Sequence, residues 1–170
     1  MHQELDRDRD RRGGADPSAD APNLDAVVGQ RRGLRRSLSD VEQALASPAA
    51  GRTAAWTARL TESLEHLCET FDLHVEVTEG PGGLFEDILA TAPRLANRVR
   101  RLRAEHASIR MAINAELLQL RGATASAAPA DVDGFRDRVN RLLALLVRHR
   151  QQGADLIYEA YHFDIGGEGS

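Results

Sequence analysis

The sequence has no lysine and a single cysteine, Cys68, and only 4% of its 170 residues are aromatic. One cysteine cannot form an intramolecular disulfide, so the chain must be held together by its hydrophobic core. A domain of this size buries roughly 70% of its unfolded surface, which is sufficient without a structural metal. A bound metal ion would therefore serve function. The exclusive use of arginine is typical of high-GC genomes and indicates no mechanism.

Long hydrophobic runs are also missing, and acidic residues outnumber basic ones. No stretch approaches the 18 apolar residues that suggest a membrane span, and residues 1–14 lack the apolar region of a secretory signal. The formal net charge of −4 argues against a general binder of nucleic acid or of anionic membranes. We therefore expect a cytoplasmic protein that binds neither nucleic acid nor membranes.

Apolar residues recur at alternating steps of three and four over four segments, which is the spacing of amphipathic helices. The first predicted helix begins after Asn23 and ends near residues 47–48, and the second covers residues 53–78 before the Pro-Gly-Gly of residues 81–83. The third runs from Pro93 to Gly122, where glycine is expected to end it, and the fourth extends from Phe135 to Phe163. Residues 84–90 are expected to add one or two helical turns.

These helices predict an all-α fold, because no segment shows sustained two-residue alternation. Four amphipathic helices with short connections bury their apolar stripes most simply as an up-down-up-down four-helix bundle. We place this bundle at residues 23–165. Residues 1–22 are polar and contain glycine and proline, so they predict a disordered tail, and residues 166–170 form a C-terminal tail.

Three of the six histidines fall on apolar seams, one on each of the last three predicted helices: His74, His106 and His149. His106 lies 14 residues before Leu120 and His149 lies 17 residues after Val132, so both are at similar heights above the loop between their helices. Three neutral imidazoles facing one cavity suit zinc, iron, copper or nickel. Hydrogen-bonded core histidines without any metal would give the same pattern, and the spacing leaves both interpretations open.

The order of these residues resembles a known family. His74 is followed by Val-Glu-Val-Thr-Glu, then by Leu84-Phe85, then by Glu105-His106, and His149 lies on the last helix. Over about residues 24–165 this layout is similar to the hemerythrin-like family, also called the HHE cation-binding domain. The resemblance implies a four-helix bundle around a carboxylate-bridged, non-haem di-iron site that binds oxygen or senses oxygen, nitric oxide or iron.

The sequence departs from the ligand pattern that this resemblance implies. The first-helix histidine of the family should fall at Gln30 or Arg31, and the bridging glutamate should fall at Thr78, one residue before Glu79. The second ligands expected after His106 and His149 are also absent, because the matching positions hold Arg110, Gly153 and Ala154, with Asp155 next. The resemblance therefore implies a degenerate ligand set.

Two hypotheses follow. In the first, the protein is a metal-binding or sensing module that holds non-haem iron or a single divalent metal, and its partner is a small molecule or a metal ion. The candidate metal ligands are His74, His106 and His149, together with the carboxylates of Glu79 and Asp155. The candidate residues that tune charge or cap an anionic ligand are Arg31 and Arg110. In the second, these arginines and nearby carboxylates fill the cavity of a metal-free scaffold protein. An enzyme is disfavoured because the bridging carboxylates are missing.

Overall fold

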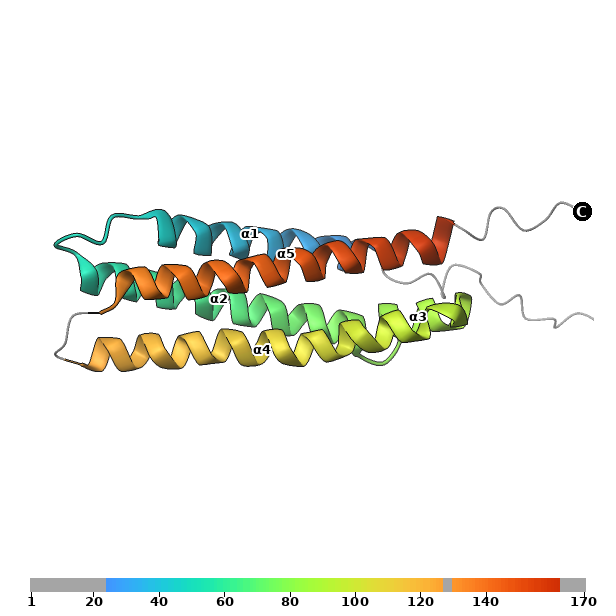
Figure 1. The fold of residues 1–170 in the computed structure, drawn as a ribbon. Helices are drawn as coiled ribbons and strands as arrows, with labels where there is room; N and C mark the ends of the chain where they lie inside the picture. Colours follow the sequence, from blue (N-terminus) through green and yellow to red (C-terminus); the bar gives the residue numbers. More distant parts are fainter. Residues whose placement is uncertain (1–23, 127–129, 163–170) are drawn as a thin grey trace, which may run out of the picture.

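The computed structural model describes residues 24–126 and 130–162, and every regular element within these ranges is helical. The elements are α1 (Leu24–Ala46), α2 (Thr53–Glu79), α3 (Leu84–Thr91), the 3-10 turn η1 (Pro93–Leu95), α4 (Ala96–Ala125) and α5 (Val132–His162). The four long helices lie side by side and alternate in direction (Figure 1), which confirms the predicted bundle. The predicted tails, residues 1–22 and 166–170, and the cap at Asn23 lie outside the described residues.

The turn after α2 leads into α3 at one end of the bundle (Figure 1). Gly80 ends α2 by donating its N–H to the carbonyl of Glu76 at 2.8 Å, and Pro81 follows it. Gly82 has a φ of 67°, a conformation that favours glycine. A Cβ on Gly83 would meet the carbonyl oxygen of Gly80 at 2.7 Å. The turn therefore needs its glycines, and it places α3 directly after α2.

The prediction that Gly122 ends its helix is wrong, because α4 continues to Ala125. Gly122 is exposed and a Cβ there would meet no atom within 4 Å, so nothing about the backbone at this position requires a break. The following residues, Ala123 and Ala125, favour helix strongly, and the hydroxyl of Thr124 donates to the carbonyl of Leu120 at 2.9 Å. The connection to α5 therefore begins at Ser126 rather than at the glycine.

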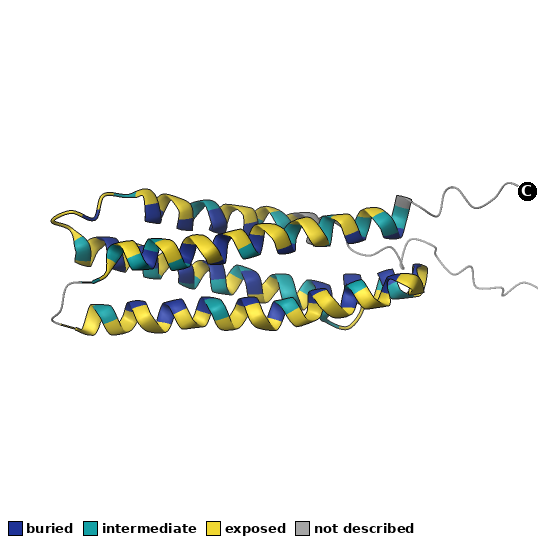
Figure 2. Ribbon diagram, in the orientation of Figure 1, coloured by how far each residue is buried: buried dark blue, intermediate teal, exposed yellow. Residues whose placement is uncertain are grey.

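The core consists of two clusters of buried side chains. The larger one fills the space between the four long helices and includes Leu34 and Phe71. The smaller one joins α3, η1, the start of α4 and the end of α5, and includes Phe85, Leu102 and Leu156. Figure 2 shows buried residues along the inner faces of the helices and exposed ones outside. No helix in the described part of the chain is long and apolar enough to cross a membrane.

Candidate metal centre

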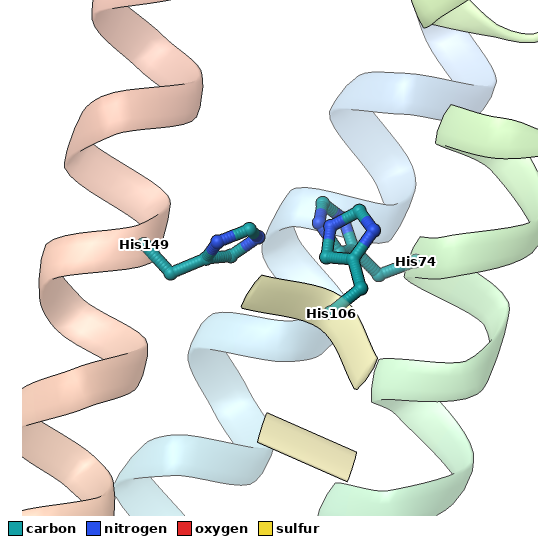
Figure 3. Close-up of side chains that lie close together, drawn as sticks. All are labelled: His74, His106 and His149. Carbon is teal, nitrogen blue, oxygen red and sulfur yellow. The ribbon is translucent and has the colours of Figure 1, made fainter. Parts of the chain in front are cut away.

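His74 on α2, His106 on α4 and His149 on α5 converge where the two core clusters meet. One ligand nitrogen from each lies within 4.8 Å of the others. The ring centroids of His106 and His149 are 4.7 Å apart, and that of His74 lies 5.2 Å and 5.7 Å from them. Figure 3 shows the three rings reaching toward one another from different helices. The structure therefore brings together all three histidines predicted as ligands.

The histidines line a small cavity whose volume is about 30 Å³. A space of this size holds one or two water molecules or a single ion. The fully buried ring of Phe71 lies about 6 Å from each imidazole, at 5.9, 5.8 and 6.3 Å. Phe85 from α3 stacks on His106 with its centroid at 5.8 Å. Other side chains in the lining are Arg31, Leu34, Thr78, Leu84, Leu102, Arg150, Leu156 and Ile157.

Two carboxylates fix the orientation of two of the rings. Nδ1 of His106 contacts Oε1 of Glu79, and Nδ1 of His149 lies 2.9 Å from Oε2 of Glu105. An ionised carboxylate only accepts hydrogen bonds, so each Nδ1 carries a proton, and in the neutral form of the ring Nε2 then keeps its lone pair. With its nitrogen turned toward Glu105, the amide of Gln152 donates to both carboxylate oxygens at 2.9 Å. Partners of this kind orient histidines and raise their basicity at metal sites.

One ring nitrogen of the cluster is left without a partner. His106 is only 3% exposed, and its Nε2 has no hydrogen-bond partner within the described residues. Leaving a buried polar atom unsatisfied costs about 1–3 kcal/mol. The structure thus contains a lone pair whose natural partner, such as a water molecule or a metal ion, would occupy the cavity.

The environment of the cluster disfavours protonated imidazole. Burial lowers the pKa of His74 to about 3, and the neighbouring His106 and His149 and the guanidinium of Arg31 act in the same direction. Burial also lowers the pKa of His106 to about 3, with His149, Arg110 and Arg103 contributing. At neutral pH both rings are therefore uncharged, which is the form that binds metal ions.

Of the two arginines that the sequence suggested for the cavity, only one lines it. Arg31 of α1 is half-buried, and burial together with the nearby Arg150 lowers its pKa. Arg110 instead lies on the outside of the bundle, where its Nη2 is 2.6 Å from Oδ1 of Asp72. The last carboxylate candidate, Asp155, is also exposed. It accepts a hydrogen bond from Gln151 at 2.9 Å, so the structure does not bring it to the histidines.

Sequence reasoning did not identify Arg150 or Phe71 as part of this site. Both lie beside the histidines because of packing between helices. Glu105 was noted beside His106, but its partner is His149 on the neighbouring helix. The matching heights of the two histidines on α4 and α5 were the signal that could have indicated this pairing.

The hemerythrin HHE cation binding domain model matches residues 23–161, which include the whole histidine cluster. The chain belongs to the hemerythrin HHE cation-binding domain family. Comparisons with curated proteins and with solved structures found no match. Among the described residues of this HHE domain, the three histidines form the group whose ligand atoms lie close enough together to hold a metal ion.

The buried histidines make the stability of the metal-free HHE domain depend on pH. In the unfolded chain each ring takes up a proton near pH 6.5, whereas His74 and His106 in the folded chain do so only near pH 3. Between these values the unfolded state binds more protons, so stability falls as pH decreases from 6.5 toward 3. The expected loss at pH 5 is on the order of 2 kcal/mol per histidine.

Urea unfolding of chelator-treated protein between pH 7 and pH 4.5 measures this dependence. His106→Gln should flatten the curve, whereas His66→Gln on the exposed surface of α2 should leave it unchanged. Equal slopes in the wild type and His106→Gln would contradict the assignment of neutral, buried rings.

Proposed function

We propose that this HHE domain binds one transition metal ion through His74, His106 and His149. The observation that carries the proposal is the buried, unpartnered Nε2 of His106, with ligand nitrogens of the other two rings within 4.8 Å. Metal–nitrogen bonds are about 2.0–2.1 Å long, so nitrogens on one ion lie within roughly 4 Å of each other. Small side-chain rotations therefore suffice to close the cluster around an ion.

The lining supports one ion rather than two. Thr78, at the position where the family resemblance implies a bridging glutamate, donates its hydroxyl to the carbonyl of His74 at 2.8 Å on its own helix. Glu79 is engaged by His106, and Asp155 lies outside the cavity. No carboxylate among the described lining residues could bridge two ions, and the space is about 30 Å³, so a mononuclear site fits best.

The ion, when bound, would supply Lewis acidity and open coordination positions. The chain's own residues prepare this site: Glu79 and Glu105 hold two rings in the tautomer that exposes Nε2, while Phe71 and Phe85 limit access of water. We infer that the ion is non-haem iron or another divalent metal. The role that follows is binding or sensing of iron, oxygen or nitric oxide in the cytoplasm, rather than turnover of a substrate.

Loss of a ligand histidine should abolish metal binding. Protein purified without a metal-affinity tag, then loaded anaerobically with ferrous iron or with zinc, should retain about one ion per chain by elemental analysis. His106→Ala and His149→Ala should each weaken binding at least about 100-fold, because two remaining imidazoles form an incomplete site. His66→Ala, an exposed histidine on α2, should bind as the wild type does.

Metal content that is unchanged in His149→Ala would overturn the ligand assignment. A wild-type protein that takes up neither ion, and whose melting temperature is unaffected by them, would favour the metal-free scaffold protein instead.

The carboxylate on His106 should tune affinity without contacting the ion. Glu79→Ala should weaken metal binding about 10–100-fold, because the ring then loses both its orientation and the negative charge that raises its basicity. Glu79→Gln, which keeps an acceptor oxygen, should fall between this variant and the wild type. Competition titration with a chelating dye measures the effect, and the exposed Glu76→Ala on the same helix is the control. An equal loss in Glu76→Ala would indicate general electrostatics rather than orientation.

Arg31 should lower the affinity of the histidine site for a metal ion, because a positive charge that lines the cavity repels a divalent cation. Arg31→Gln is expected to tighten zinc binding by about tenfold, or 1.4 kcal/mol. Arg110→Gln should tighten binding less than Arg31→Gln, since the guanidinium of Arg110 is paired with Asp72 on the outer surface and does not line the cavity. Isothermal titration of both variants decides the point. Tighter binding in Arg110→Gln alone would reverse the assignment of the two arginines.

A further inference from the structure

A second concentration of positive charge lies on the side of the bundle where α1 faces α5. A groove of about 590 Å³ is lined there by Arg32, Arg35, Arg36 and Arg150, together with Leu38, Ser39, Glu42 and Val147. Four guanidinium groups thus share the groove with a single carboxylate, although the whole chain has a net charge of −4. The positive charge of the groove is local, and the composition of the whole chain does not predict it.

The arginines of this groove repel one another. Arg32 and Arg36 are four residues apart on α1, as are Arg31 and Arg35, and like charges at this spacing destabilise a helix. Arg150 on α5 is close enough to repel Arg31, which lies beside the groove, since Arg150 helps to lower the pKa of Arg31. Within residues 24–126 and 130–162 no carboxylate forms an ion pair with Arg32, Arg35, Arg36 or Arg150. Folding therefore assembles a cationic cluster that the described chain does not neutralise.

We propose that this groove binds a small polyanion that carries two or more phosphate or carboxylate groups. Guanidinium groups form charge-assisted, often bidentate hydrogen bonds with both kinds of group. The volume lies within the range of about 300–1,000 Å³ that is typical of small-ligand sites. Leu38, which is buried, and Val147, which is 47% exposed, add an apolar surface beside the charges.

The dimensions of the cluster favour a small ligand over a polymer. The Cα positions of Arg32 and Arg36 are separated by about 6 Å along the helix axis, and Arg150 lies across the groove. Charges confined to about one helical turn match a molecule of a few phosphate or carboxylate groups. An extended nucleic acid would need a longer basic surface.

The groove is separate from the histidine cavity. Arg150 is the one residue that lines both, and the remaining arginines of the groove project from α1 on the outer side. Binding of a polyanion here does not require a metal ion. Polyanion binding can therefore be tested on metal-free protein. If the proposal of a metal site fails, the proposal of a polyanion site is unaffected.

The experiment is isothermal titration of the metal-free full chain with inorganic triphosphate and with citrate at low ionic strength. Metal-free protein is required because both probes chelate metals. Arg35→Gln combined with Arg36→Gln should weaken binding at least tenfold. The control combines Arg59→Gln with Arg141→Gln, two exposed arginines on α2 and α5 that do not line the groove. It changes the net charge equally and should alter the dissociation constant less than twofold.

Binding of either probe that is lost only in the groove variant supports the proposal, and the stronger probe identifies the acidic group. The groove variant relieves repulsion on α1, so its melting temperature without ligand should be at least that of the wild type, which excludes misfolding as the cause. Equal weakening in both double variants, or no binding of either probe at millimolar concentration, would overturn the proposal. Tighter binding of a short polyglutamate peptide than of triphosphate would also overturn it, in favour of an acidic segment of a protein partner.

Discussion

The enclosure of His74, His106 and His149 inside an apolar bundle is the constraint on which the rest of the site depends. Desolvation disfavours the protonated forms of His74 and His106, and every buried ring nitrogen needs a hydrogen-bond partner or a ligand. Glu79 and Glu105 meet this need for His106 and His149, respectively, at Nδ1. The same contacts leave Nε2 of each ring with its lone pair. A network that satisfies one side of the rings thereby prepares the other side for coordination.

The side chains that line the cavity carry a different charge from those of a carboxylate-rich metal site. The lining contains three imidazole rings and the guanidiniums of Arg31 and Arg150, while the carboxylates contact the histidines from outside the cavity. Such a set of ligands suits a single metal ion that is bound with moderate affinity, because the protein does not fully compensate the charge of the ion. An anion that accompanies the ion would then find a favourable partner in Arg31.

The short helix α3 closes the end of the bundle near the histidines. Its position depends on the glycine-rich turn at residues 80–83, which joins α2 to α3. Leu84 and Phe85 then reach the cavity, and Phe85 stacks on His106. The turn and the cluster are therefore linked, because a bulkier turn would displace the aromatic ring that covers the site.

The sequence alone determined the four helices and the inward direction of His74, His106 and His149, because both follow from the spacing of apolar residues along each helix. Tertiary structure decided which polar groups accompany them. Arg110, four residues after His106, could have faced inward, but its long side chain pairs with Asp72 outside the bundle. For Asp155 helical periodicity already gave the answer, because six residues after His149 place it on another side of α5. Glu105 meets His149 only because α4 and α5 pack at matching heights, and such pairings between helices leave no periodic trace in a single sequence.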